Sequence, residues 1–317
     1  MVYDAIIVGT GSAGGVLADR LTDGTGKQVL VLEAGPDFET MYPGTDPADE
    51  RSRLRSVRAN CTQHSMDTFH WAYTDSSGNQ IPYGKNVGGS GSHNGMQSYR
   101  ATRLQHSLWP PGWHYNDFAP YYDAVGQRMN VHPLPRIVMD PAALAFEESA
   151  LDLGYPAIED FNDTPGNNVT RGVGPNPYNA RGLVDPASGN GLIDKYGGRQ
   201  GPLEVYIRPA RARSNFTLIA DALVDRVLYE PRSGGWHAQA VRYTDRGGAT
   251  HIAEGKLILV CASAFGSPTL LMRSGIGAGL QVNLPQVGRN YVNQAVGFMS
   301  IEYDQPLHGN HRHPIWN

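Results

Sequence analysis

Three glycines near the start of the chain have the spacing of a phosphate-binding loop. Gly9, Gly11 and Gly14 form the pattern G-x-G-x-x-G. The first glycine permits a tight turn, the second lets the backbone approach a pyrophosphate, and the third lets a helix pack closely on a strand. A helix that begins at this loop presents free N–H groups and the positive end of its dipole to a phosphate. The pattern therefore predicts a nucleotide-binding site at this turn.

An acidic residue follows where a dinucleotide needs one. Glu33 ends the second apolar run of the chain. A carboxylate at that place can accept hydrogen bonds from the hydroxyl groups of an adenosine ribose. An ordinary βα turn that binds no ligand is the alternative reading. The motif alone does not separate NAD from FAD.

A βαβ unit has to position these residues. The apolar runs at 3–8 and 28–33 predict two buried strands, and the pattern of 13–22 predicts the helix between them. This order is typical of a parallel nucleotide-binding sheet. Beyond it, residues 36–83 and 154–202 read as irregular. The other predicted elements are helices at 116–130, 141–153 and 266–274 and strands at 216–229, 236–253 and 256–261.

The composition suits a soluble protein with a sizeable core. The chain has 317 residues, of which 40% are hydrophobic and 18% charged. A net charge of −4 gives no attraction to nucleic acid or to an anionic membrane. No apolar run approaches the roughly 20 residues that span a bilayer. The two cysteines, Cys61 and Cys261, are far apart in sequence and predict no disulfide, so we expect a reducing, cytoplasmic location.

Two further segments resemble the signatures of a known family. Residues 84–94 (GKNVGGSGSHN) resemble the first signature loop of the glucose-methanol-choline (GMC) flavoprotein oxidoreductases, and residues 263–277 (SAFGSPTLLMRSGIG) resemble the second. Residues 284–290 look like the segment that follows it. Because GMC enzymes use FAD, the resemblance implies FAD rather than NAD.

The signature residues have physical roles that fit a cofactor site. Gly88 and Gly89 remove side chains where the backbone lies against a diphosphate and a flavin. Ser267 and Pro268 can open a helix, as its cap and its first residue. Val224 matches a family valine whose backbone contacts adenine, although simple strand packing would also explain it. The predicted cofactor-binding residues are Gly9, Gly11, Ser12, Gly14, Glu33, Ala34, Gly88, Gly89, Ser90, His93, Asn94, Gly95, Val224, Ala262 and Ser263.

His93 departs from the first signature in an informative way. Ser92-His93-Asn94 is similar to the segment that carries the flavin covalently in the choline oxidase and pyranose dehydrogenase branches. The resemblance implies a bond from the imidazole to the 8α-methyl carbon of the flavin, since a neutral imidazole nitrogen is a competent nucleophile. The alternative is a histidine that hydrogen-bonds phosphate or backbone.

The catalytic histidine of the family has no counterpart in this sequence. GMC enzymes carry it near the end of a much longer chain, so we expect it beyond Asn317, with a second polypeptide as the expected partner that supplies it. His308, His311 and His313 do not match its position. A metal site at these histidines is not favoured, because no acidic residue or cysteine lies beside them in the sequence. The identity of the catalytic base stays open, and no metal is predicted.

The fold class that follows is α/β: a Rossmann-like FAD-binding domain with an interleaved, incomplete substrate or cap domain. The resemblance implies an FAD-dependent oxidoreductase that oxidises the CH–OH group of a small alcohol or sugar by hydride transfer to flavin N5. A lyase of the hydroxynitrile lyase type and a non-catalytic FAD-binding subunit are the alternatives. The predicted FAD-binding parts are 1–40, 84–135 and 203–300, and the predicted cap and substrate parts are 41–83, 136–202 and 301–317.

Overall fold

The chain divides into two compact units. The computed structural model describes residues 1–41, 70–92, 94–136, 139, 141–163, 171–180 and 199–292. Among these, the first unit holds 1–41, 70–92 and 201–292, and the second unit holds the rest. Within the described residues, the units divide after residues 93 and 200, whereas the predicted parts meet after 40, 83, 135 and 202. The functions assigned to those parts stay predictions.

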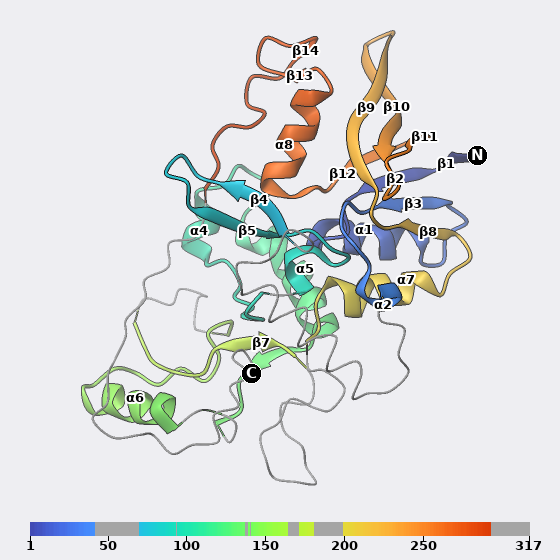
Figure 1. Cartoon of the computed structure of the whole chain (residues 1–317). Helices are drawn as coiled ribbons and strands as arrows, with labels where there is room; N and C mark the ends of the chain where they lie inside the picture. The colour runs from blue at the N-terminus through green and yellow to red at the C-terminus, as the bar shows by residue number, and fades with distance from the viewer. Residues whose placement is uncertain are drawn as a thin grey trace. The chain divides into compact units, whose positions relative to one another are not determined.

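A four-stranded parallel sheet is the centre of the first unit (Figure 1). Its order is β12-β2-β3-β8, and every neighbouring pair is parallel. Every residue of β2 and β3 is buried, as expected for strands covered on both faces. The predicted α/β class is confirmed. The strands are β2 (Ala5–Val8), β3 (Val29–Leu32), β8 (Phe216–Ile219) and β12 (Ile258–Val260).

Alternation along β2 and β3 sends side chains into two separate cores. Ile6 and Val8 pack with residues of the second sheet and of α8 (Ser263–Arg273). Ala5 and Ile7 pack on the other face, with α1 (Ser12–Thr22) and η4 (Leu203–Ile207). The parallel sheet is therefore the middle layer of three.

The second sheet of this unit has the order β1-β11-β10-β9. Its long strands are antiparallel, and β1 joins the edge as a parallel strand. The strands are β1 (Val2–Tyr3), β9 (Leu223–Arg232), β10 (Gly235–Thr244) and β11 (Thr250–Gly255). Smaller elements of the first unit are α2 (Phe38–Met41), β4 (His70–Thr74), β5 (Gln80–Gly84), η1 (Gly89–Ser92), α7 (Arg208–Arg211), β13 (Ile276–Gly277) and β14 (Val282–Asn283).

Most of the regular structure of the second unit is helical in its described residues. The buried His106 imidazole connects two of its helices, because its ring nitrogens lie 2.9 Å from the Trp113 carbonyl oxygen and 2.9 Å from the Tyr122 hydroxyl. The elements are α4 (Arg103–Ser107), α5 (Tyr115–Arg128), β6 (Val131–Pro133), α6 (Pro141–Asp152) and β7 (Pro177–Asn179).

Two predicted elements are wrong in their extent. The predicted strand at 216–229 is two strands in different sheets, because Asp221 takes a left-handed backbone (φ 53°) between β8 and β9. The stretch 36–83 is not irregular throughout: β4 and β5 form a hairpin. Its aromatic face packs against α8, with the Tyr73 and Phe265 rings 5.3 Å apart. Such a tertiary contact is not visible in the sequence.

The predicted start of the last helix is also wrong. α8 begins at Ser263, so Ser267 is not its cap and Pro268 lies inside it. The Ser263 hydroxyl accepts a hydrogen bond from the Gly266 N–H at 3.3 Å. A proline at the sixth helical position removes one hydrogen bond and brings its ring against the carbonyl group four residues back, which strains the helix. The structure nevertheless keeps Pro268 inside α8.

Gly14 should be essential for folding. An added Cβ there would lie 1.9 Å from the Gly9 carbonyl oxygen, whereas no described atom lies within 4 Å of one added at Gly26. We expect Gly14→Ala to lower the free energy of unfolding by about 3 kcal/mol or more and Gly26→Ala to change it by less than about 0.5 kcal/mol. Denaturant unfolding of both variants measures this. Equal midpoints would show that the backbone contact at Gly14 is not tight.

Candidate dinucleotide-binding site

The first glycine-rich loop connects β2 to α1. Gly9 has a left-handed backbone (φ 99°), and an added Cβ there would lie 2.5 Å from the Cys261 carbonyl oxygen. The same test excludes a side chain at Gly14. Gly11 differs, because no heavy atom of the described residues lies within 4 Å of its added Cβ. Gly9 and Gly14 are thus required by the chain itself, whereas Gly11 leaves space for a ligand.

The N-terminus of α1 opens onto that space. The helix has 11 residues, its N-cap is Gly11, and its first turn holds no acidic residue. Ser12 is exposed at its start. The first N–H groups of a helix and the positive end of its dipole favour an anion. A pyrophosphate therefore fits the chemistry of this turn.

The Glu33 carboxylate is buried directly after β3. Its Oε2 accepts hydrogen bonds from the Thr10 N–H at 2.9 Å and the Thr10 hydroxyl at 2.6 Å, and its Oε1 accepts one from the Gly35 N–H at 3.0 Å. Burial raises the pKa of Glu33, and the hydrogen bonds from Thr10, Gly35 and Ala34 oppose that shift. Two of the three hydrogen bonds given above reach Oε2 and one reaches Oε1, so a further donor such as a ribose hydroxyl would bind at Oε1.

Thr10 is a site residue that the sequence predictions missed. It is completely buried. Its hydroxyl donates to Glu33 and accepts a hydrogen bond from the Gly88 N–H at 3.0 Å. The only signal in the sequence is a hydroxyl-bearing residue between two motif glycines. Thr10 joins the first glycine-rich loop, the end of β3 and the second glycine-rich loop.

The structure brings the second glycine-rich loop onto the first. Gly88 and Gly89 both have left-handed backbones, with φ of 95° and 56°. An added Cβ at Gly89 would lie 3.0 Å from the Gly11 Cα. The two loops are far apart in sequence but form one site around Gly11.

The serines of the second loop bond within the chain. Ser90 Oγ accepts from the Gly84 N–H at 2.9 Å, and Ser92 Oγ donates to the Val87 carbonyl oxygen at 3.1 Å. These bonds shape the loop. A contact of Ser90 with the cofactor stays a prediction.

The connection from β12 to α8 also lies at this site. Ala262 is the N-cap residue of α8, Ser263 has a left-handed backbone (φ 74°), and the carbonyl group of Cys261 faces Gly9. Val224 is buried and its side chain belongs to one of the two cores of the sheet. Its predicted backbone contact with adenine stays a prediction.

The cofactor contacts predicted for Asn94 and Gly95 stay predictions. Asn94 and Gly95 belong to the second unit, where Asn94 Oδ1 accepts hydrogen bonds from the Met96 N–H and from Arg199. His93 and the three histidines of the 301–317 segment lie outside the described residues. The covalent attachment predicted at His93 therefore rests on the sequence alone.

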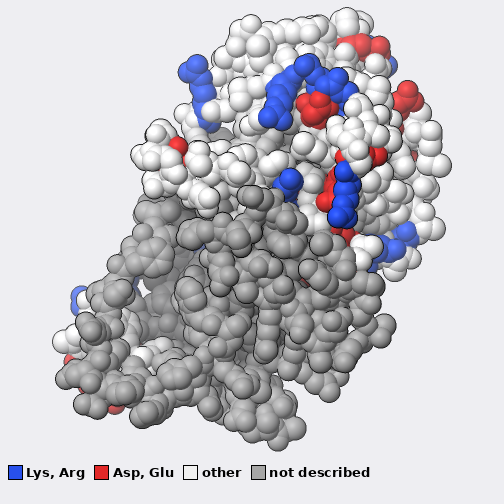
Figure 2. All heavy atoms as spheres, in the orientation of Figure 1, with Lys and Arg blue, Asp and Glu red and all other residues white. Residues whose placement is uncertain are grey.

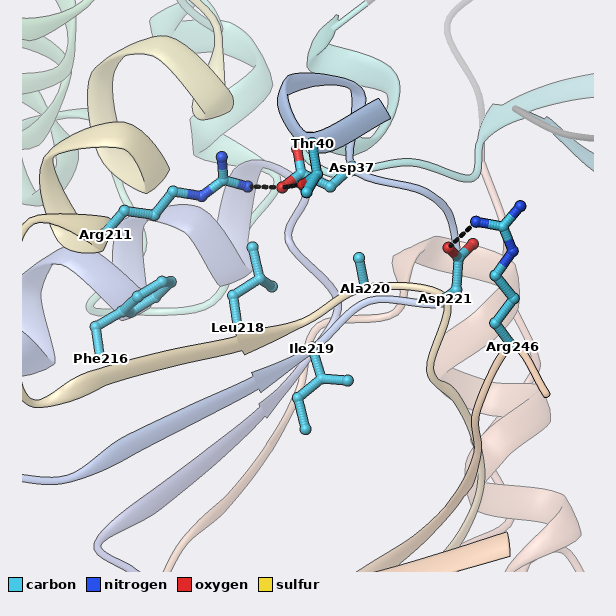
Figure 3. A pocket seen from close by; sticks show the side chains of 9 residues that line it. All are labelled: Asp37, Thr40, Arg211, Phe216, Leu218, Ile219, Ala220, Asp221 and Arg246. Atoms are coloured by element: carbon cyan, nitrogen blue, oxygen red, sulfur yellow. Dashed lines mark hydrogen bonds and ion pairs between the residues drawn. The ribbon is translucent and has the colours of Figure 1, made fainter. Parts of the chain in front are cut away.

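A separate cavity of about 700 Å³ lies beside β8, at the edge of the parallel sheet (Figure 3). An ion pair lies at each end of the cavity. Arg211 pairs with Asp37 at 2.5 Å at one end, and Arg246 pairs with Asp221 at 3.9 Å at the other. None of the predicted cofactor-binding residues lines it. Its lining consists of Asp37, Thr40, Arg211, Phe216, Leu218, Ile219, Ala220, Asp221 and Arg246.

The charges on one face, the lengths of the helices and the metal-binding types of side chain bear on other ligand classes. On the face that Figure 2 shows, basic and acidic side chains are mixed. In the part of the chain that the structure describes, no helix has both the length and the apolar character to cross a bilayer. Within the same residues, no cluster of His, Cys, Asp and Glu side chains has the arrangement of a metal site.

Fold and site together define an α/β protein of the dinucleotide-binding type. The family model described as GMC oxidoreductase matches residues 3–296. The chain therefore belongs to the GMC oxidoreductase family, and the resemblance of its two signature segments is confirmed.

Curated relatives include several oxygen-dependent choline dehydrogenases. The chain is 31% identical to the one from Pseudomonas fluorescens (strain SBW25), over 96% of this chain and 55% of the relative. It is 30% identical to the one from Yersinia pseudotuberculosis serotype O:1b (strain IP 31758), over 97% of this chain and 55% of the relative. The chain thus spans about half the length of these relatives.

Solved structures agree with the fold. Pyridoxine 4-oxidase from Mesorbium loti superimposes with a TM-score of 0.64 at 25% identity, over 87% of this chain and 52% of the other. A formate oxidase superimposes with a TM-score of 0.62 at 18% identity, over 87% and 48%, which supports the fold alone.

Gly11 should be needed by the ligand and not by the fold. Its backbone (φ −64°, ψ −164°) suits alanine, and the space beside it is open. We expect Gly11→Ala to change the free energy of unfolding by less than about 0.5 kcal/mol while weakening FAD binding at least roughly 10-fold, because a methyl group would occupy the space of the pyrophosphate. Fluorescence titration with FAD measures this, with Gly26→Ala as the control. Wild-type affinity in Gly11→Ala would place the pyrophosphate elsewhere.

Proposed function

We propose that this chain binds FAD and forms the cofactor-binding part of an enzyme that oxidises a CH–OH group in a small alcohol or sugar. The observation that carries the proposal is the open space at Gly11, between the N-terminus of α1 and the second glycine-rich loop. Membership of the GMC family favours FAD over NAD. The names of the relatives, choline dehydrogenase and pyridoxine 4-oxidase, favour a hydroxyl-bearing small molecule as the substrate.

Different residues of the chain would bind different parts of the cofactor. The backbone at Gly11 and the start of α1 would hold the pyrophosphate, and the ionised Glu33 carboxylate would accept hydrogen bonds from the ribose. FAD, when bound, accepts the hydride that leaves the alcohol carbon. The chain itself would orient this cofactor and limit its contact with water.

In this proposal, the catalytic base that accepts the proton of the substrate hydroxyl lies outside these 317 residues. Two considerations support this. None of the described residues matches the position of the family histidine, and the relatives are nearly twice as long as the part that this chain matches. A second polypeptide could supply the missing residues. A cofactor-binding part without turnover of its own is therefore the second candidate function.

Binding and turnover can be measured separately on the same chain. We expect the purified 317-residue chain to take up one FAD and to show no alcohol or sugar oxidation with a dye acceptor. Addition of the polypeptide that supplies the rest should restore turnover, and the substrate should bleach the flavin without oxygen. Turnover of the chain alone in the usual range of roughly 1–1000 per second would place the base within these residues. Conversion of substrate by a flavin that stays oxidised would favour the lyase.

We also propose that FAD is bound covalently through His93. Ser92-His93-Asn94 motivates this, because the segment is similar to the flavin-carrying segment of two branches of the family. After acid precipitation, the yellow colour should stay in the pellet, and the His93 peptide should gain the mass of the flavin. Complete release of flavin to the supernatant, with an unmodified peptide, would contradict it. His93→Ala should still bind FAD, because the Gly11 and Glu33 contacts remain.

A further inference from the structure

Thr10 lies where the first glycine-rich loop, the end of β3 and the second glycine-rich loop meet. It is completely buried, between the left-handed Gly9 and the open Gly11. Its hydroxyl donates to Glu33 Oε2 at 2.6 Å and accepts from the Gly88 N–H at 3.0 Å. These bonds connect residues that lie 23 and 78 positions away in sequence.

A hydroxyl group satisfies both neighbours with a single atom. A backbone N–H such as that of Gly88 can only donate, and an ionised carboxylate such as that of Glu33 can only accept. The side chain between them must accept from one and donate to the other. Valine has nearly the shape of threonine but can do neither, whereas serine can do both.

The position of Gly88 matters because of its neighbour. Gly88 and Gly89 form a left-handed turn that lies close to Gly11. A Cβ added at Gly89 would lie 3.0 Å from the Gly11 Cα. Glu33 Oε1 accepts from the Gly35 N–H at 3.0 Å, whereas Oε2 accepts from both groups of Thr10, so Oε1 is the oxygen at which a ribose hydroxyl would bind. Thr10 thus holds a ribose acceptor with one bond and a pyrophosphate-facing turn with the other.

We propose that Thr10 is a positioning residue for the dinucleotide: its hydroxyl couples Glu33 to the second glycine-rich loop, so that the ribose and pyrophosphate contacts form together. The inference rests on the proposed function, FAD binding. It assigns a role to a motif position that the spacing of the glycines leaves unspecified.

The test compares Thr10→Val and Thr10→Ser in the full 317-residue chain. We expect Thr10→Val to weaken FAD binding roughly 10- to 100-fold, since it leaves a buried N–H unpaired and removes a hydrogen bond to a charged group. Thr10→Ser should bind within about 3-fold of the wild type. Fluorescence titration gives both values. Equal losses in the two variants would overturn the inference, because the hydroxyl would not be the cause.

Thr22 offers a matched control. It is also buried, and its hydroxyl likewise both donates and accepts: it donates to the Ala18 carbonyl oxygen at 2.7 Å and accepts from Arg213 at 2.9 Å. It lies at the far end of α1 from the glycine-rich loops. We expect Thr22→Val to lower the melting temperature without changing FAD affinity. If Thr22→Val lost as much FAD affinity as Thr10→Val, the effect of Thr10 would be one on stability alone. The proposal of a positioning role would then be wrong.

A second test needs no foldable Thr10 variant and uses the His93→Ala chain, in which no covalent bond through His93 can form. Adenosine, which lacks phosphates, should displace FAD from this chain at high concentration. Relative to the ligand-free chain, it should slow amide hydrogen exchange in residues 84–92, through Glu33 and Thr10. Adenosine that fails to displace FAD, or that displaces FAD without slowing exchange, would overturn the coupling. A chain that binds no FAD at all would instead contradict the proposed function.

Discussion

Close contact between backbones at one end of the parallel sheet is the constraint on which the rest of the structure depends. The carbonyl group of Cys261, after β12, lies where any side chain at Gly9 would clash, and the carbonyl group of Gly9 lies where any side chain at Gly14 would clash. These contacts bring α1 directly onto the end of β2. The N-terminus of the helix can then face the same space as Gly11, which is the only one of the three motif glycines whose missing side chain leaves room for a ligand.

The same crowding accounts for the buried carboxylate of Glu33. Burial favours the neutral form of a carboxyl group, and this is the main cause of its raised pKa. Three hydrogen bonds from Thr10 and Gly35 stabilise the charged form and leave acceptor capacity. An acceptor whose orientation is already fixed loses less entropy when a ligand binds. The cost of burying Glu33 is consistent with a binding role rather than a contribution to stability.

The sequence predicted the local parts of the fold and missed the parts that depend on distant contacts. The βαβ unit was correct because its strands are buried on both faces and its turn needs glycine. The single strand predicted at 216–229 was wrong because its apolar residues continue through Asp221, where the backbone turns from one sheet to the next. The hairpin of β4 and β5 was missed because its aromatic face is covered by α8, a helix almost two hundred residues away.

The candidate site shows the same limit at the scale of single side chains. The motif glycines and Glu33 could be read from spacing, because each is needed for a local backbone or chemical reason. Thr10 could not, because its role depends on an N–H of Gly88 that only the folded chain brings within 3.0 Å. Ser90 and Ser92 show the converse: polar residues beside a motif glycine suggest ligand contacts, yet their hydroxyl groups bond within their own loop. The role of a polar residue next to a glycine-rich motif is therefore ambiguous until its hydrogen-bond partners are known. Its hydroxyl can bind the ligand directly, or it can stabilise the loop that binds the ligand.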